Sequence, residues 1–367
     1  RPGRTPRLWL WQPEDFWHAP PAAPEAWWAD HYDLRPVAEP SEWQPELNES
    51  VATALIADPR DFGTLGRHAE LNPPALLARL DEARTVKTDW EIACIAAANR
   101  IAVTGHKAAA AAFESGASEL EIHLAYLKAA GHDPDTLPYP SIVCLNEHAA
   151  ILHYHNRDCA APNAHRSFLI DAGADRHGYA ADVTRTWAAP DAGLFGELIE
   201  AVDAMQRHLA GRMQTGREYT DLNQEAHRGV AEILHGHGLC NMSLDAMLEA
   251  EVTSTFLPHG LGHFLGVQVH DVAGLTAPDG RDLPAPRQHP ALRLTRALET
   301  DNVLTVEPGL YFIPALLDTL RQSPLSRNLD WKRIEALIPF GGIRIEDNVV
   351  VALEQPRNLT REAWEQD

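Results

Sequence analysis

Several residue types and patterns that would assign this sequence to a specialised class of protein are scarce or missing. Lys and Arg together number 31 against 52 Asp and Glu, which gives a net charge of −21. Binding to nucleic acid or to an anionic membrane surface needs basic patches, so neither partner is expected. No apolar run approaches the roughly 18–20 residues of a membrane-spanning helix, and no secretory signal is visible.

Cysteine is also scarce. The four cysteines are widely spaced and form no CxxC pair, so they indicate reduced structural thiols of a cytoplasmic protein: Cys94, Cys144, Cys159 and Cys240. The sequence has no evident repeat or low-complexity segment. It opens on Arg1 rather than Met, inside a passage rich in Pro and Trp, and we therefore expect further residues upstream of it.

What the sequence does have is enough apolar material for a large core in two domains. It contains 367 residues, of which 45% are hydrophobic and 23% charged. Residues 1–60 hold six of the ten tryptophans, with a strand expected at residues 8–11, and residues 61–84 have the composition of a connector. The composition shifts near Lys87. We predict a partial α/β domain over residues 1–84 and a catalytic domain over residues 85–367.

Helical and strand patterns alternate in the second domain. An Ala-rich helix is expected from Asp89 to about Glu114, and the capping box Ser118–Glu121 opens a second helix that stops at Gly131. Further elements are expected as follows: two short strands within 141–154, helices over 195–213 and about 222–236, and strands over 303–307 and 342–351. This order predicts an α+β or mixed α/β fold with the acids of its sheet facing one cleft.

The segment 168–186 contains the first pair of candidate functional residues. An apolar strand ends in Asp171, and Asp182 follows eleven residues later. A two-residue loop at Arg176 and His177 would place the two aspartates opposite each other on one face of a hairpin. Two carboxylates in that position repel each other, so a cation is expected between them. Taken alone, the segment fits two exposed acids beside a loop equally well.

Two glutamates occupy comparable positions further along the chain. Glu307 is the last residue of an expected strand, which Pro308 ends, and Glu346 shares one strand face with Arg344. Either glutamate by itself fits a salt-bridged strand residue, with Arg344 as the partner of Glu346. An acid inside an apolar strand is costly to bury unless it is paired or bound to metal, and four acids at strand positions favour metal.

Three histidines lie among glycines within twelve residues: His259, His263 and His270. Glycine lets the backbone approach a ligand closely, although a single histidine out of 19 is usually an ordinary residue. Four carboxylates with one imidazole form a hard, oxygen-rich site that favours Mn²⁺ or Co²⁺ over structural zinc. Two divalent ions would balance the four carboxylates and activate a bridging hydroxide.

The motifs resemble those of the creatinase and methionine-aminopeptidase superfamily of metallopeptidases. The resemblance rests on IDAGADRHGYAADVTRT, HGLGHFLGVQVHD, TVEPGLYF and GIRIEDNVVV. Within the superfamily, the sequence is similar to the bacterial Xaa-Pro dipeptidases (prolidases) and the organophosphorus acid anhydrolases. The resemblance covers nearly all residues after Lys87 and extends weakly into residues 5–45. It implies a pita-bread catalytic domain, a smaller N-terminal domain that is truncated here, and a cytoplasmic homodimer.

The resemblance implies a role for each candidate ligand of two metal ions, most simply Mn²⁺, with Co²⁺ or Zn²⁺ as alternatives. Asp171 would bind one ion in a bidentate manner, and Asp182 and Glu346 would bridge both. His263 and Glu307 would bind the second ion. Glu307 would also accept the proton of the attacking hydroxide or water.

The resemblance also implies roles for residues around the metals. Three outer histidines would hold the substrate and stabilise the tetrahedral oxyanion: His259, His270 and His153. Arg344 would support the metal cluster, and Tyr311 would take part in proton shuttling. Tyr139 matches an active-site tyrosine, and Arg293 matches the arginine that receives the carboxylate of a C-terminal proline.

The expected activity is therefore hydrolysis of Xaa-Pro dipeptides, with a side activity on organophosphorus esters as a further implication. The alternatives are an aminopeptidase P, a methionine aminopeptidase, a metal-free creatinase and a non-catalytic binding module. Five ligands in order argue against the last two, and the N-terminal domain argues against methionine aminopeptidase. Two local departures from the family pattern occur, at His155 and at Pro140.

Overall fold

The structure is a computed structural model that describes residues 5–13, 16–17, 26–39, 42, 54–62 and 69–366. The chain divides into two compact units, residues 1–73 and residues 74–367. The second unit begins with helix α3 (Pro74–Thr85). The domain boundary expected after residue 84 stays a prediction. Residues 63–68 of the expected connector lie outside the described residues.

The first unit contains two short parallel strand pairs. β1 (Arg7–Trp11) pairs with β2 (Asp33–Val37), and helix α1 (Ala26–Ala29) lies between them in the chain. β3 (Ala54–Leu55) pairs with β4 (Glu70–Leu71), with α2 (Pro59–Phe62) between them. Parallel neighbours need a crossover connection, which gives this unit its α/β character. β1 contains the strand expected at residues 8–11.

Two capped helices follow α3 in the second unit. α4 (Asp89–Glu114) starts after Thr88, which exchanges hydrogen bonds with Glu91 in a capping box. α5 (Glu119–Ala130) has the same arrangement at Ser118 and Glu121. It ends at Gly131, whose φ of 67° is a left-handed cap that glycine adopts without strain. Both helices have the bounds expected from the sequence.

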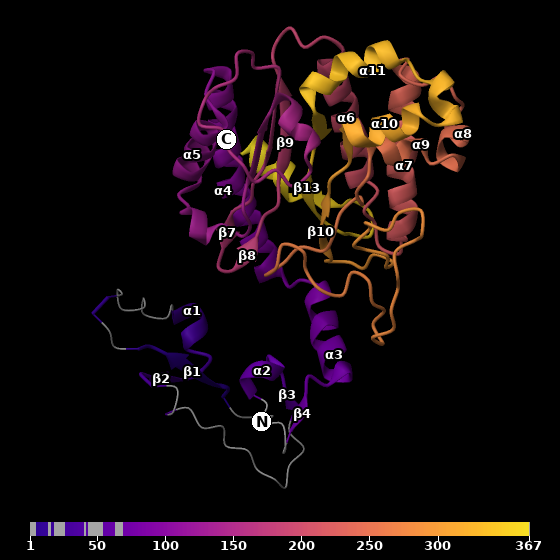
Figure 1. Ribbon diagram of the computed structural model, residues 1–367. Coiled ribbons are helices and arrows are strands. Elements are labelled where there is room, and N and C mark those ends of the chain that lie inside the picture. Colours follow the sequence, from indigo (N-terminus) through magenta and orange to yellow (C-terminus); the bar gives the residue numbers. More distant parts are fainter. Residues whose placement is uncertain are drawn as a thin grey trace. The chain divides into compact units, whose positions relative to one another are not determined.

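Two three-stranded antiparallel sheets form the centre of the unit, with α4 and α5 on one side and α6 (Leu194–Ala210) and α7 (Tyr219–Gly236) on the other (Figure 1). The first sheet has the order β5-β6-β9 and the second β10-β13-β14. A bridge between Thr184 and Glu346 connects the two sheets. Their strands are β5 (Ile142–Leu145), β6 (Ser167–Asp171), β9 (Thr184–Ala188), β10 (Val303–Val306), β13 (Asp347–Val350) and β14 (Arg357–Asn358).

The remaining elements of the second unit surround these sheets. The helices are α8 (Leu244–Glu249), α9 (Val252–Phe256), α10 (Pro314–Arg321), α11 (Trp331–Leu337) and α12 (Leu359–Glu365). The short strands are β7 (Asp175–Arg176), β8 (Tyr179–Ala180), β11 (Gly309–Tyr311) and β12 (Gly342–Arg344). The 3₁₀ turns are η3 (Pro134–Thr136), η4 (Asn146–Ala150), η5 (Pro324–Asn328) and η6 (Ile338–Phe340). No helix in the described part of the chain is long and apolar enough to span a membrane.

The hairpin between Asp171 and Asp182 differs from its predicted register. β7 pairs Asp175 with Ala180, so the two loop residues are His177 and Gly178 rather than Arg176 and His177. Their φ values are 55° and 82°. Two-residue hairpin loops favour turns with positive φ at both positions, and the glycine belongs inside such a loop. The predicted register left Gly178 outside it.

Two strand predictions also need correction. Residues 141–154 form one strand, β5, followed by η4, because Asn146 adopts a left-handed φ of 56° and turns the chain. The single strand predicted over 342–351 is interrupted between β12 and β13, at Ile345 and Glu346. Glu346 instead bridges to Thr184 of the other sheet. The interruption therefore lies where the two sheets meet.

Candidate active site

The ends of two neighbouring strands hold the two aspartates. β6 ends at Asp171, which pairs with Thr184 at the start of β9, and Asp182 comes two residues before that strand. The Tyr139 hydroxyl lies between the carboxylates, 2.8 Å from Asp171 Oδ1 and 2.6 Å from Asp182 Oδ1. The register differs from the predicted one, but the two aspartates do converge.

The two glutamates lie across from each other in the second sheet. β10 pairs with β13 and β11 pairs with β12 in one continuous register, and Glu307 and Glu346 fall opposite each other in the gap between these ladders. Directly opposed like charges destabilise a sheet. The four acids Asp171, Asp182, Glu307 and Glu346, which we call the carboxylate cluster, line one cavity of about 270 Å³.

Arg344 pairs with Asp171 rather than with Glu346. Its guanidinium donates to Asp171 Oδ2 at 2.8 Å and to Thr184 Oγ1 at 3.2 Å. Glu346 instead accepts a hydrogen bond of 2.6 Å from the Thr184 hydroxyl. The salt-bridge interpretation of Glu346 is therefore wrong, because its strand neighbour Arg344 points to a different acid.

His263 directs one ring nitrogen at the carboxylate cluster. Its Nδ1 lies 2.9 Å from the Phe264 carbonyl oxygen, which can only accept, so Nδ1 carries the proton. Nε2 lies 3.4 Å from Asp182 Oδ2 and 3.6 Å from Glu307 Oε1. A Cβ on Gly262 would lie 2.2 Å from the Thr305 carbonyl oxygen. Only glycine lets this loop approach β10 so closely.

Burial of several acids together makes the cluster electrostatically strained. Burial, followed by the charges of Asp182, Glu307 and Asp171, raises the pKa of Glu346 well above its ordinary value. Burial and the nearby aspartates, opposed by His263, raise the pKa of Glu307 to about 7. Burial also raises the pKa of Asp171, in spite of Arg344. Cations placed among these groups would relieve the repulsion.

His259 belongs to a directed chain of hydrogen bonds. Its Nδ1 faces the Gly260 carbonyl oxygen at 2.8 Å, so Nε2 is left to accept from the Tyr311 hydroxyl, also at 2.8 Å. Arg344 donates to the Tyr311 oxygen at 2.8 Å. Burial, followed by the charge of Arg344, lowers the pKa of His259 to about 4, which keeps the ring neutral. Both ring nitrogens are therefore occupied within the protein.

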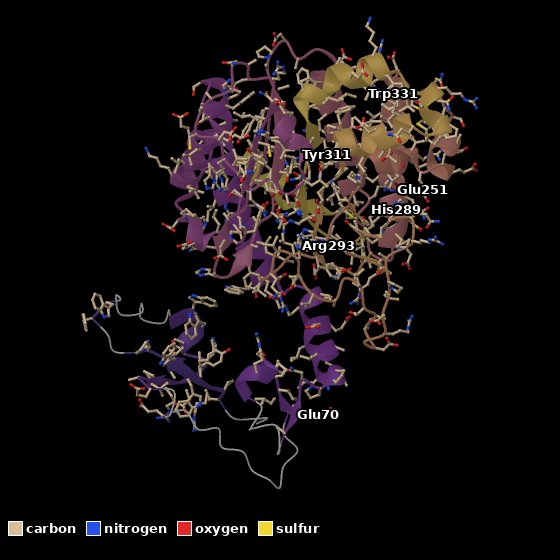
Figure 2. All side chains as sticks on the ribbon, in the orientation of Figure 1. Glu70, Glu251, His289, Arg293, Tyr311 and Trp331 are labelled. Carbon is tan, nitrogen blue, oxygen red and sulfur yellow. The ribbon has the colours of Figure 1, made fainter. Side chains whose placement is uncertain are left out.

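Three further predicted residues line the same cavity: His153, His270 and Arg293. The ring of His270 meets the ring of His263 edge-on, with centroids 4.4 Å apart. Arg293 is exposed and forms no salt bridge with a carboxylate in the described part of the chain. Arg293 and Tyr311 are both labelled in the middle of the second unit in Figure 2. The structure therefore brings every predicted site residue to this cavity or into contact with its lining.

The sequence analysis did not identify the polar residues whose side chains form hydrogen bonds to the backbone of Asp182 and Glu346. Asn348 accepts from the Asp182 amide at 3.1 Å and donates to the Asp182 carbonyl oxygen at 2.6 Å. Asn99 on α4 donates to Asn348 at 2.9 Å, and Arg185 donates to the Glu346 carbonyl oxygen at 2.7 Å. Thr184 could have been found, since it shares a strand face with Asp182. The contact of Asn99 with Asn348 joins segments 249 residues apart and leaves no local signal.

Comparison with known proteins adds two family matches. The model of metallopeptidase family M24 matches residues 93–352. The model described as Xaa-Pro dipeptidase, N-terminal domain, matches residues 1–81. Together the two matches cover most of the chain.

Curated relatives and solved structures agree with these matches. A Xaa-Pro dipeptidase of Xanthomonas campestris pv. campestris is 45% identical over 98% of this chain and 82% of its own length. One of Pectobacterium carotovorum is 47% identical over 97% of this chain and 82% of its own length. Proline aminopeptidase P II from Yersinia pestis has a TM-score of 0.62 at 27% identity, over 80% of this chain and 60% of that one. Zinc-substituted aminopeptidase P of E. coli with bound product gives 0.63 at 26%, with the same coverage.

Proposed function

We propose a two-metal mechanism for this chain, which belongs to metallopeptidase family M24 and, within it, to the Xaa-Pro dipeptidases. The family has the pita-bread catalytic fold, with a separate N-terminal domain. In this mechanism the chain hydrolyses dipeptides that end in proline. The main observation in support of the mechanism is that the carboxylate cluster and His263 line one cavity.

The donor set fits divalent metal ions. One donor atom from each of Asp182, His263 and Glu346 lies within 4.8 Å of the others. Nε2 of His263 faces two carboxylates, an arrangement that is repulsive unless a proton or a cation lies between them. We propose that Asp171 would help to hold one ion and that His263 and Glu307 would help to hold a second, with Asp182 and Glu346 as ligands available to both. Hard oxygen donors favour Mn²⁺, with Co²⁺ or Zn²⁺ as alternatives.

The chain's own residues then perform the remaining tasks. Bound ions would supply Lewis-acid polarisation of the scissile carbonyl and would acidify water. Glu307 accepts a proton from the attacking water and passes it to the leaving proline nitrogen. His270 donates to the oxygen that becomes negative, and His153, which lines the same cavity, holds the substrate. His259 orients Tyr311, because its two nitrogens are already engaged.

Arg293 selects substrates by length, because it binds the C-terminal carboxylate of a dipeptide. Its exposed guanidinium has no carboxylate partner in the described residues, so it is available for the carboxylate of a C-terminal proline. Such a contact is charge-assisted and bidentate. Arg293→Ala should raise KM for Xaa-Pro strongly while metal content stays unchanged.

Substrate length separates this proposal from aminopeptidase P, the activity that the names of the structural neighbours give. We expect the wild-type protein to hydrolyse Ala-Pro and to leave Ala-Pro-Ala intact, because the tripeptide has no carboxylate at the position of Arg293. Steady-state rates on the two peptides, with Ala-Ala as a control, test it. Efficient cleavage of Ala-Pro-Ala would instead favour an aminopeptidase.

Three finer properties complete the proposal. A cytoplasmic location fits the four free cysteines. A homodimer and a side activity on organophosphorus esters rest on the family resemblance. Sedimentation equilibrium and a phosphotriester assay test them directly.

A further inference from the structure

Glu119 is a buried carboxylate outside the cavity that the mechanism above does not use. It is the first residue of α5 and is 1% exposed. Four protein groups donate to it. Oε1 accepts from the Leu145 amide at 2.8 Å and lies 2.7 Å from His148 Nδ1. Oε2 accepts from the Tyr154 hydroxyl and the Asp158 amide, both at 2.9 Å.

These four hydrogen bonds exclude the simpler interpretation of a metal site. Donor atoms of Glu119, His148 and Asp158 lie close enough together to suit an ion. However, each oxygen of Glu119 already accepts two hydrogen bonds, and a carboxylate offers about four acceptor positions. The Nδ1 of His148 is hydrogen-bonded to the same carboxylate and is not available to an ion. Glu119 is therefore a saturated acceptor that joins segments of protein.

The joined segments lie on both sides of His153 in the chain. Leu145 and His148 precede it, and Tyr154 and Asp158 follow it. The Tyr154 ring is buried and stacks on His148 with centroids 4.6 Å apart. The Asp158 carbonyl oxygen also accepts from the Leu120 amide of α5 at 3.2 Å. Both ends of the loop that carries His153 are thus fixed to the first turn of α5.

His153 depends on this loop for its position. Its side chain is exposed and lines the cavity, and none of the hydrogen bonds in the described part of the chain involves its ring. We propose that Glu119 is a positioning residue that places His153 in the active site by clamping residues 145–158. The proposal rests on the function proposed above, in which His153 holds the substrate.

Glu119→Gln tests the clamp with minimal change of shape. Glutamine replaces one oxygen by an NH₂ group. In either placement of the amide this group faces a backbone N–H that can only donate, from Leu145 or from Asp158, so at least one of the four hydrogen bonds is lost. With two Mn²⁺ per chain retained, we expect kcat/KM for Ala-Pro to fall by about tenfold to a hundredfold, the size of effect that small misplacements of reacting groups produce. The matched control is Glu121→Gln, which removes the same charge from the same helical turn but contacts only Ser118. It should leave kcat/KM unchanged.

A double-mutant cycle with His153→Ala distinguishes positioning from general destabilisation. If Glu119 acts through His153, the double variant should be no slower than His153→Ala alone. Effects that multiply would overturn the proposal, and so would a folded Glu119→Gln protein with wild-type kcat/KM. Tyr154→Phe removes one of the four hydrogen bonds and replaces Glu119→Gln in the cycle if that variant fails to fold.

An NMR readout keeps the clamp separate from the proposed function. The His153 ring signal of ¹⁵N-histidine-labelled protein, identified by its loss in His153→Ala, should shift or broaden in Glu119→Gln and not in Glu121→Gln. An unchanged His153 signal overturns the clamp. A wild-type protein without Xaa-Pro hydrolysis would refute the proposed function, while the NMR comparison would still test the clamp.

Discussion

At the scale of single residues, the two histidines of the glycine-rich segment should fail in different ways. His263 points Nε2 at the carboxylate cluster, whereas the His270 ring lines the cavity and meets the His263 ring edge-on. His270→Ala should keep its metal and its KM while kcat falls by about 10²–10³, the usual cost of a lost oxyanion donor. His263→Ala should lose metal affinity first and regain part of its activity in excess Mn²⁺. Metal analysis and steady-state kinetics on both variants check this.

The reverse pattern for the two variants would move the ligand assignment by one histidine in the motif. If His270→Ala changed neither metal content nor kinetics, His270 would be an ordinary surface histidine without a role in catalysis.

Residue types and spacing predicted four acids and three histidines as candidates, and the family resemblance added Tyr139, His153, Arg293 and Tyr311, but neither indicated how these residues are held. The four acids and the histidines His259, His263 and His270 could be found because each lies at a strand position or among glycines. The partners of Arg344 could not be found, since the nearest acid in sequence is Glu346 and the nearest in space is Asp171. Arg344 reaches Asp171 across the junction of two sheets, which no strand-face argument contains.

At the scale of elements, the close contact between the His263 loop and β10 should be intolerant of side chains. A Cβ at Gly262 would lie 2.2 Å from the Thr305 carbonyl oxygen and 2.6 Å from the Tyr219 hydroxyl. Gly262→Ala should therefore reduce the free energy of unfolding by about 1–3 kcal/mol, the usual cost of overpacking. It should also weaken metal binding, because His263 is the next residue.

Gly236 at the end of α7 is the matched control for this substitution. A Cβ there would meet no atom within 4 Å. Gly236→Ala should leave stability unchanged or raise it slightly, because alanine is the better helix former. Chemical denaturation of the two variants measures the difference. Equal stability of both variants would contradict the packing argument.

A second prediction at this scale concerns pH and the contact between α7 and α9. His227 on α7 stacks on His289 at 4.2 Å and bonds Thr253 on α9 through Nδ1 at 3.0 Å. Burial, followed by the charge of His289, lowers the pKa of His227 to about 3. The unfolded chain binds the proton more readily, so this residue's contribution to stability is complete above about pH 6.5 and declines as the pH falls toward 3.

Replacing the histidine should remove that pH dependence. The expected slope is at most about 1.4 kcal/mol per pH unit over this window. His227→Asn should therefore lose less stability than the wild type between pH 7 and pH 5 at equal metal content. Denaturation at the two pH values measures the loss, and parallel losses in both proteins would show that His227 does not titrate with folding.

Local signals determined which elements could be predicted. The extents of α4 and α5 were predictable from local signals, an Ala-rich run for α4 and a capping box with a C-terminal glycine for α5. The hairpin loop was misplaced by one position, since either neighbour of His177 could complete it. The second strand expected in 141–154 failed because the Asn146 side chain bonds the Ala164 carbonyl oxygen and the Arg166 amide across the loop. No signal within 141–154 indicates that contact.

At the scale of the whole molecule, the site is assembled from segments that are distant in sequence. The carboxylate cluster spans Asp171 to Glu346, and the loop of His153 comes from a third segment. The order of these segments was visible from the sequence, together with the division into two domains. Their convergence depends on the meeting of two sheets at Thr184 and Glu346, which only the structure provides. The four acids of the carboxylate cluster account for only a small part of the 52 acidic residues behind the net charge of −21.

In the proposed mechanism, two metal ions in the carboxylate cluster support Xaa-Pro hydrolysis. The most direct measurement is the rate of Ala-Pro hydrolysis while Mn²⁺ is titrated into chelator-treated protein. We predict no activity without metal and a maximum at about two ions per chain, as a two-metal site requires. Asp182→Asn and Glu346→Gln should bind less metal and stay slow at that ratio. Full hydrolysis by the exhaustively chelated protein would contradict the two-metal mechanism.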